Sequence, residues 1–150
     1  MTIRDGLSNS QAVGALVPVV GTTNRVGVPQ DLQGSYKNSV TFCIGASGDT
    51  LSGSVKMTCI IRESDSAASG FTPVDLSDLL YEVGTPNPSN GYWEAVIDDN
   101  AEDERVIKVS YIGSKRYIRP EVLFTGTHTN GTPVAIVVDL YKNQLPADNS

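Results

Sequence analysis

The segment Ser39-Val40-Thr41-Phe42-Cys43-Ile44 indicates the fold class, because apolar and polar side chains alternate along it. Val40, Phe42 and Ile44 would lie on one face of an extended chain, and this period of two predicts a half-buried strand. Residues 55–62 repeat the pattern, with Val, Met, Cys and Ile on one face. We therefore expect two strands here, either in one sheet or in two neighbouring sheets.

Further strands are predicted on both sides of these two. Alternation and β-branched content predict extended segments at residues 15–20, 92–97, 105–112, 116–125 and 133–142. The chain holds 17 Val, 9 Ile and 12 Thr, so 38 of its 150 residues are β-branched, and 14 Gly and 8 Pro punctuate the strands. Roughly seven to eight short strands with frequent turns predict an all-β fold, a jelly-roll-type β-sandwich, over residues 36–142.

Three segments fall outside this strand pattern. Glycine and proline interrupt residues 1–35, so we expect an extended, irregular N-terminal arm that lies over its own domain or over a neighbour. Deleting residues 1–20 is then expected to leave the β domain folded. Leucine and valine at helical spacing in residues 75–83 predict one short helix or helical turn. The polar residues 143–150 are expected to form a flexible tail.

The two cysteines are expected to be reduced, structural thiols. If residues 39–44 and 55–62 form a hairpin around Gly48 and Asp49, Cys43 lies opposite Lys56 and about 10 Å along the strand from Cys59. A disulfide needs Cα atoms within about 7 Å of each other, so that hairpin argues against one.

Charge and hydropathy argue against two classes of partner. The net charge of -6 disfavours nucleic acid, because phosphate binding needs a surplus of Lys and Arg. No apolar run approaches the ~20 residues of a membrane-spanning helix, so we expect no membrane partner either.

No constellation of residues in the sequence predicts an enzyme. His128 is the single histidine and has Thr and Asn as its neighbours, so we interpret it as a polar turn residue rather than a general base. The acidic cluster at residues 98–104 departs from the helix-loop-helix calcium pattern and is interpreted as a solvated loop. The basic residues within 115–119 are expected to pair with carboxylates such as Glu121 or with a partner protein. We therefore expect no catalytic site, no cofactor and no metal.

Four stretches spread over most of the chain carry a resemblance to known proteins. In order, they are Met1-Thr2-Ile3-Arg4-Asp5-Gly6-Leu7; Asp31-Leu32-Gln33-Gly34 leading into Ser39-Val40-Thr41-Phe42; Arg62-Glu63-Ser64-Asp65 followed by Gly70-Phe71-Thr72-Pro73-Val74; and Val109-Ser110-Tyr111-Ile112-Gly113-Ser114-Lys115-Arg116-Tyr117-Ile118-Arg119. Together they resemble the small jelly-roll cement or decoration proteins on the heads of tailed bacteriophages. The last stretch is the most specific.

That resemblance implies a capsid decoration protein that binds the outer surface of a bacteriophage head and bridges major capsid proteins. It implies a protein made in the host bacterial cytoplasm and carried on the outside of the virion, as a dimer or trimer on a capsid symmetry axis. The expected contacts with the capsid or with another subunit come from the apolar part of the arm, namely Leu16, Val17, Pro18, Val19 and Val20.

Two other functions remain open from the sequence. A carbohydrate-binding jelly-roll module would need an exposed aromatic platform with polar groups around it. Tyr92 and Trp93 form the one local aromatic pair, but a period of two sends their side chains to opposite faces of a strand. A head–tail joining or tail structural protein would share the virion setting.

Overall fold

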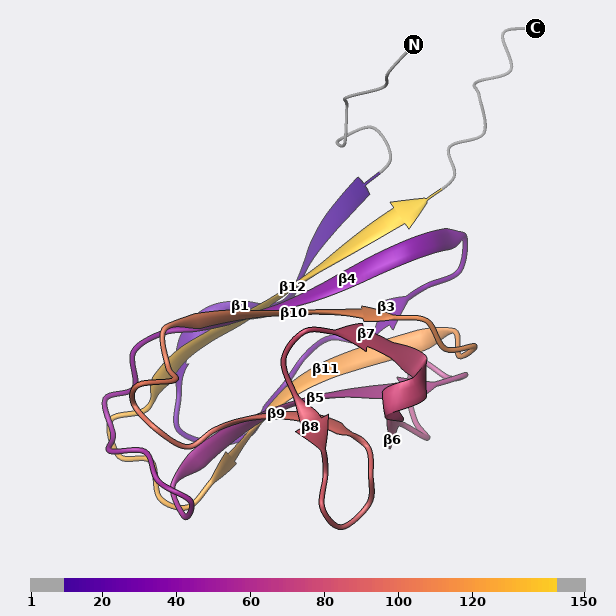
Figure 1. Cartoon of the computed structure of the whole chain (residues 1–150). Coiled ribbons are helices and arrows are strands. Elements are labelled where there is room, and N and C mark those ends of the chain that lie inside the picture. The colour runs from indigo at the N-terminus through magenta and orange to yellow at the C-terminus, as the bar shows by residue number, and fades with distance from the viewer. Residues whose placement is uncertain (1–9, 143–150) are drawn as a thin grey trace, which may run out of the picture.

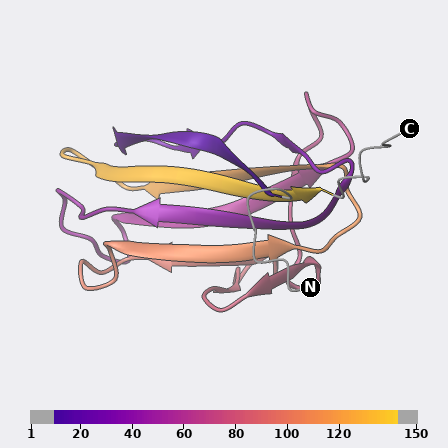
Figure 2. The ribbon, with the colours of Figure 1, turned by 90° about the horizontal axis from the view of Figure 1, so that it is seen from above.

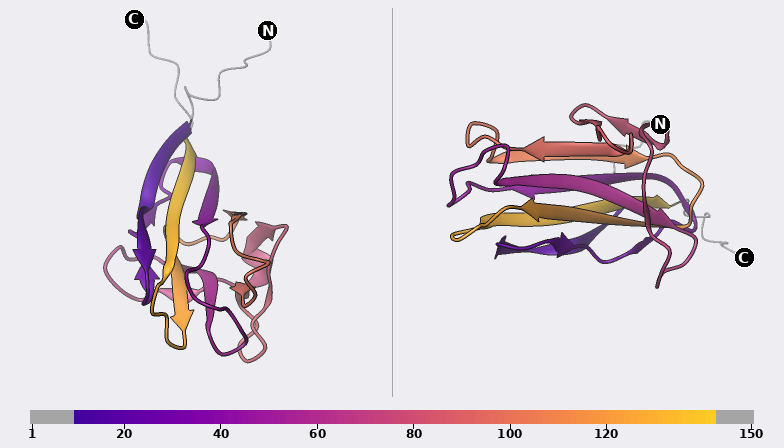
Figure 3. Two further views of the ribbon diagram at one scale, coloured as in Figure 1. Left: turned by 90° about the vertical axis from the view of Figure 1, so that its left-hand side faces the viewer. Right: turned by 90° about the horizontal axis from the view of Figure 1, so that it is seen from below.

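The protein is an all-β sandwich in the computed structural model, which describes residues 10–142. Two antiparallel sheets pack face to face (Figure 1). The first, sheet A, has the strand order β1 (Ser10–Gly21), β12 (Thr132–Lys142), β4 (Ser35–Ile44), β10 (Arg105–Tyr111) and β7 (Leu79–Tyr81), as Figure 2 shows from above. Sheet B has the order β2 (Arg25–Val26), β11 (Tyr117–Thr125), β5 (Lys56–Ser64), β9 (Trp93–Ile97) and β8 (Thr85–Pro86) (Figure 3). Two short strands complete sheet B, with β3 (Gln30–Asp31) beside β11 and β6 (Thr72–Pro73) beside β5.

The order of the long strands is that of a jelly roll. Along the chain, successive strands β1, β2, β4 and β5 alternate between the two sheets, and so do β9, β10, β11 and β12, while β5 and β9 are neighbours in sheet B. The quartet β1-β12-β4-β10 therefore faces the quartet β2-β11-β5-β9, which is the eight-stranded, double-sheet arrangement of jelly rolls. The predicted all-β, jelly-roll-type sandwich is confirmed.

The core lies between the inner faces of the two sheets. Phe42 from sheet A contacts Trp93 from sheet B, with ring centroids 6.2 Å apart. The indole N–H of Trp93 is satisfied by the carbonyl oxygen of Val83 at 3.1 Å. The next residue, Gly84, has a φ of +126°, and a Cβ there would lie 2.1 Å from the indole nitrogen. Glycine is therefore required at this position for two reasons: the positive φ of the backbone and the space that Trp93 occupies.

Residues 10–21 form a long strand, so the expectation of an irregular arm over residues 1–35 is wrong for this part. β1 pairs with β12 from Ser10 opposite Tyr141 to Gly21 opposite Thr132, and it includes the extended piece predicted at residues 15–20. Two register shifts, between Gly14 and Leu16 and between Leu16 and Val19, accommodate Gly14 and Pro18. An edge strand tolerates a proline because one side of its backbone needs no hydrogen-bond partner. Residues 1–9 of the predicted arm and the predicted tail, residues 143–150, lie outside the described residues.

Of the short helix or helical turn predicted at residues 75–83, only a single turn forms. Residues 75–83 hold one turn of 3₁₀ helix, η1 (Leu76–Asp78), and then enter β7. Leu79 is buried and Leu80 is 60% exposed, which is the alternation of a strand. Pairing of β7 with β10 outweighs the helical spacing of the leucines, since a short helix has little stability of its own. No helix among residues 10–142 is long and apolar enough to cross a membrane.

The predicted hairpin between residues 39–44 and 55–62 does not form, because β4 and β5 lie in different sheets. Cys43 of β4 has Ala135 and Val106 as its cross-strand neighbours, not Lys56. Cys59 of β5 is fully buried in the core between the sheets, and both cysteines are free thiols. The long connection over residues 45–55 carries the chain from one layer to the other instead of turning back along β4.

Neighbouring residues of β1 give a direct test of its place in the core. Leu16 is 8% exposed and belongs to the core, whereas Val17 is 67% exposed. We expect Leu16→Ala to lower the free energy of unfolding by about 2 to 4 kcal/mol, because the buried methyl groups leave a cavity. Val17→Ala is expected to change it by less than about 0.5 kcal/mol. Urea denaturation of both variants measures the difference, and equal effects would contradict a core position for β1.

Candidate functional site

The outer face of sheet A carries a contiguous set of apolar side chains, which we call the apolar face. It consists of Pro18, Val20, Cys43, Val106, Pro133, Ala135 and Val137. Cross-strand pairing brings these residues together, because Cys43 lies opposite both Ala135 and Val106, and Val20 lies opposite Pro133. Residues opposite each other share one face of a sheet. The apolar face therefore draws on β1, β12, β4 and β10.

The centre of the apolar face is hollow. Cys43 and Ala135 are short side chains at its middle, and Val106 and the two prolines stand around them, leaving a hollow of about 600 Å³. The charged residues that line it are Glu104 and Arg105, at one end. The side chain of Val106 is 66% exposed. In a chain of net charge -6, this surface is apolar and carries one charge of each sign.

Four of the five contact residues predicted from the sequence are on the surface, and one is not. Val17, Val19 and Val20 are 67%, 47% and 56% exposed, and Pro18 lines the hollow. Leu16 points into the core instead. Leu16 lies opposite the core residue Ile136 and therefore shares the inner face of the sheet. Between Leu16 and Val19 the register shifts, and three steps on β1 match two steps on β12. Such a bulge disrupts the ladder locally, and Pro18, which has no backbone N–H to donate, lies within it.

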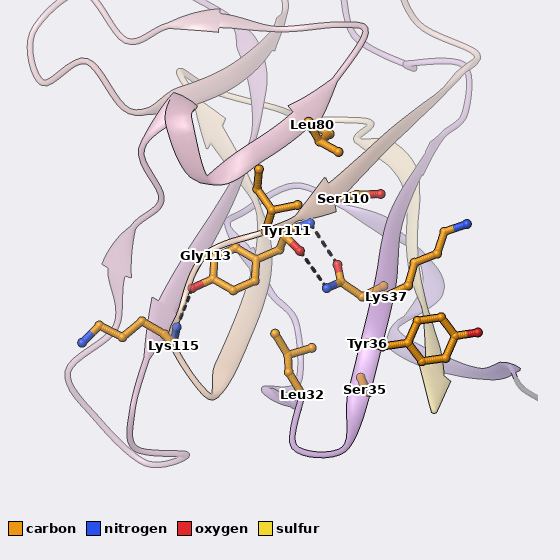
Figure 4. A pocket seen from close by; sticks show the side chains of 11 residues that line it. Leu32, Ser35, Tyr36, Lys37, Leu80, Ser110, Tyr111, Gly113 and Lys115 are labelled. Carbon is orange, nitrogen blue, oxygen red and sulfur yellow. Dashed lines mark hydrogen bonds between the residues drawn. The ribbon is translucent and has the colours of Figure 1, made fainter. Parts of the chain in front are cut away.

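A second opening, the β4–β10 slot, lies where β4 and β10 part. Their ladder ends at Val40 opposite Val109. Beyond it, the Asn38 side chain takes the place of the strand, because its Nδ2 donates to the Tyr111 carbonyl oxygen and its Oδ1 accepts from the Tyr111 N–H, both at 2.9 Å (Figure 4). The slot has a volume of about 550 Å³, and Leu32, Tyr36, Lys37, Leu80, Ile112 and Lys115 are among its lining residues.

Tyr111 closes one wall of the slot. Its hydroxyl donates to a Glu63 carboxylate oxygen and accepts the backbone N–H of Lys115 at 2.9 Å. Burial, and then the hydrogen bond to Glu63, raise the pKa of Tyr111 above its ordinary value. The hydroxyl therefore stays protonated and acts as a fixed structural link rather than as an acid or base.

Asp49 joins three loops at the opposite end of the sandwich. Its Oδ1 accepts the backbone N–H groups of Thr129 and Asn130, and its Oδ2 accepts that of Gly131 at 2.8 Å. These bonds, that of Asn130 foremost, hold the pKa of Asp49 below its ordinary value of 3.8. The carbonyl oxygen of Asp49 also accepts a hydrogen bond from Asn100. One aspartate thus fixes the β11–β12 turn and the loop after β9.

His128 belongs to this loop cluster and lies in the turn between β11 and β12, where the sequence predicted a polar turn residue. Its side chain is fully buried, edge-on to the ring of Phe124 with centroids 4.9 Å apart. Its Nε2 lies 3.0 Å from the Thr125 carbonyl oxygen, and its Nδ1 lies 3.7 Å from Asp49 Oδ2 without a hydrogen-bond partner. A polar turn sequence gives no signal for such burial, because one of the groups beside the ring, the Asp49 carboxylate, comes from a distant loop.

The acidic cluster at residues 98–104 is partly used to hold loops together. Asp103 Oδ2 accepts the backbone N–H of Ser47 at 2.8 Å, and Asn100 Oδ1 accepts that of Leu51 at 2.8 Å. Among residues 10–142, no group of three or more His, Cys, Asp and Glu side chains is placed to hold a metal ion.

The basic residues near Tyr117 pair with carboxylates, which confirms that part of the sequence prediction. Arg119 pairs with Glu121 at 2.8 Å, and Glu121 also accepts a bond from Arg62 at 2.9 Å. Arg116 pairs with Asp31 at 2.8 Å and lowers the pKa of that carboxyl to about 2. Both partners of this second pair are nearly half exposed, so water screens it and it contributes little to stability.

Comparisons with known proteins add little to this geometry. No family model and no curated protein sequence matches the chain. Among solved structures, it is similar to a mitogen from Yersinia pseudotuberculosis, with 10% identity, 94% of this chain and 92% of that chain covered, and a TM-score of 0.37. It is also similar to a family two carbohydrate esterase from Cellvibrio japonicus, with 14% identity, coverage of 92% and 35%, and a TM-score of 0.26. These TM-scores carry no argument, so the fold assignment rests on the strand order.

The two cysteines should differ in reactivity, because Cys43 lies on the outer face of sheet A whereas Cys59 of sheet B lies in the core. Cys43 is half-buried on the apolar face, whereas burial raises the pKa of Cys59 to about 12. Thiolates are the reactive species. We expect Ellman's reagent to modify one thiol in the folded protein and two in urea, and we expect Cys43→Ser to remove the fast phase. Two equally reactive thiols in the folded protein would contradict the placement of Cys59.

The role of Asp49 predicts a pH-dependent stability difference. Its pKa is lowered in the folded protein, so its contribution to stability is present above about pH 4 and is lost as the pH falls through the folded pKa. Asp49→Asn removes the charge and keeps one acceptor oxygen. We expect the variant to unfold at lower urea concentration than the unaltered protein at pH 5 to 7. The difference between the two urea midpoints, which we call the gap, is expected to narrow below pH 4. A gap that widens with acid would show that the charge is not stabilising.

Proposed function

We propose that this protein is a capsid decoration, or cement, protein that binds the outer surface of a bacteriophage head and stabilises it by bridging major capsid proteins. The observation that carries the proposal is the apolar face on the outer side of sheet A. Contiguous apolar patches on a protein surface often mark sites of protein–protein interaction. The resemblance of four sequence stretches to phage cement proteins supplies the identity of the partner, the major capsid protein.

The chemistry of the apolar face suits docking on a protein surface. Removing apolar area from water contributes roughly 25 cal/mol per Å², and the residues involved lose little conformational freedom because strands hold them. Val17, which is 67% exposed, adds apolar surface on the edge strand β1. No charged side chain lies at the centre of the apolar face, so docking does not bury an unpaired charge there.

Repetition on the shell makes a small interface sufficient. Each decoration protein that contacts two capsid subunits gains effective concentration for the second contact. Association with itself as a dimer or trimer on a symmetry axis would add to this effect. In this proposal the protein is synthesised in the host bacterial cytoplasm and is then located on the outer surface of the virion. The net charge of -6 fits a location away from packaged DNA.

A carbohydrate-binding module is less well supported. Trp93, one half of the aromatic pair at residues 92 and 93, is 1% exposed and lies in the core. Its indole cannot serve as a stacking platform for a sugar ring. A head–tail joining or tail structural protein would also dock through an apolar face, and it would be distinguished by its position on the virion.

Substitution of one exposed valine tests the proposal. Val106 lies on the apolar face, and Val26 is an equally simple control, because it is 52% exposed on the outer side of sheet B opposite Glu121. We expect Val106→Asp to weaken binding to phage heads at least ten-fold, since a carboxylate would be buried against apolar groups. Val26→Asp is expected to bind as the unaltered protein does. Co-sedimentation with purified heads that lack the protein measures both.

Equal binding by the two variants would overturn the role of the apolar face. Failure of the unaltered protein to sediment with its own heads would overturn the cement function itself. Binding restricted to one vertex of the head, seen by electron microscopy, would favour the head–tail joining function. Protection of the Cys43 thiol from labelling on binding is expected as well, because Cys43 lies at the centre of the apolar face.

A further inference from the structure

We propose that the β4–β10 slot binds an extended, acidic peptide segment of a partner protein, which adds a short strand to the free edge of β4. The slot is separate from the apolar face and does not depend on the capsid function. Addition of a strand to an open edge is a general mode of peptide recognition, in which main-chain hydrogen bonds supply affinity and side-chain pockets supply specificity.

The hydrogen-bonding pattern shows that the edge of β4 is free at the slot. The Tyr111 N–H and carbonyl point toward β4, because both bond to the Asn38 side chain. Backbone N–H and carbonyl groups alternate in direction along a strand. The N–H and carbonyl of Val109, two residues earlier, therefore also point toward β4, where they bond to the opposite residue, Val40. The backbone groups of Asn38 and Tyr36 then point toward β10 as well. Within residues 10–142 no strand pairs with β4 on that side beyond Val40.

The Asn38 side chain sets the width of the opening. An asparagine spans part of the distance between two strands, so β4 and β10 are already more than one strand spacing apart at this position. Toward Tyr36, β4 continues along β12 to Ser35, whereas β10 ends at Tyr111, so β10 has no strand residues to pair with this part of β4. The volume of about 550 Å³ lies in the range of ligand pockets, which is about 300 to 1,000 Å³.

The walls of the slot favour alternating aliphatic side chains in the peptide. Leu32 and Leu80 approach it from opposite sides in Figure 4. Ile112 is 54% exposed and also lines it. An extended segment with β-branched residues at alternate positions can place them against these walls while its backbone pairs with β4.

The charges of the slot favour an acidic peptide. Its lining holds two lysines, Lys37 and Lys115, and no aspartate or glutamate, although acidic residues outnumber basic ones by 17 to 11 in the chain. Lys115 pairs with Asp65 at 2.7 Å. Lys37 lies 5.0 Å from the centroid of the Tyr141 ring and has no carboxylate partner among the described residues. Lys37 is therefore the cation available to a peptide carboxylate.

Titration of isotope-labelled protein with a short model peptide tests the proposal by nuclear magnetic resonance. The probe is acetyl-Thr-Val-Asp-Val-Thr-amide. We expect millimolar binding with shifts at the amides of Tyr36, Asn38 and Ile112. The same peptide with lysine for aspartate should bind about two- to five-fold more weakly, the effect of one solvent-exposed charge pair. A peptide with proline for both valines should not bind, because it lacks the N–H groups that would pair with β4.

Two variants of the protein separate slot binding from general charge attraction. Lys37→Ala should abolish the preference for the aspartate peptide. Lys108→Ala removes an exposed lysine of the same sheet outside the slot and should leave the preference unchanged. Absence of shifts at the slot amides at millimolar peptide overturns the proposal. Equal binding of the aspartate, lysine and proline peptides overturns it too, and so does loss of the preference in both variants.

Discussion

Strand β12 lies between β1 and β4, and its register with both of them positions both surfaces of sheet A. On its inner side, Val134, Ile136 and Val138 contribute to the core. On its outer side, Pro133, Ala135 and Val137 form the middle of the apolar face. A shift of one residue in this register would exchange the two sets and expose the core residues. The burial of β-branched side chains therefore fixes the outer surface at the same time as the inner one.

The two ends of the sandwich are held by different means. At the end with the β11–β12 turn, the carboxylate of Asp49 accepts three backbone N–H groups and replaces the pairing that a loop cannot make. At the other end, the amide of Asn38 replaces one step of the β4–β10 ladder. In the first case the side chain closes loops onto one another. In the second it holds two strands apart and leaves an edge of β4 open, which is the physical origin of the slot.

The apolar face and the slot are both on the side of the molecule formed by sheet A. Sheet B has a buried charge network on its outer side, where Glu121 is 3% exposed between Arg62 and Arg119. A carboxylate with two guanidinium partners is already satisfied and has no need of a ligand. This contrast between the two sheets is the reason that sheet A, rather than sheet B, is expected to face a partner.

The sequence by itself determined the all-β class and the position of most long strands, because a period of two and β-branched side chains are local properties of the chain. It also predicted Glu121 as a carboxylate partner for the basic residues near Tyr117, while the partner Asp31 appeared only in the structure. It did not determine which strands are neighbours: β4 and β5 follow each other in sequence and lie in different sheets. Nor did it show that the edge strand β1 contributes side chains to the core, or that leucines at helical spacing form β7. It also did not show that Leu16 points inward while Val17 points outward. Only the tertiary structure decided these points. Sheet pairing joins residues more than a hundred positions apart, and a bulge or a core contact with a distant strand outweighs the weak preferences of a short local segment.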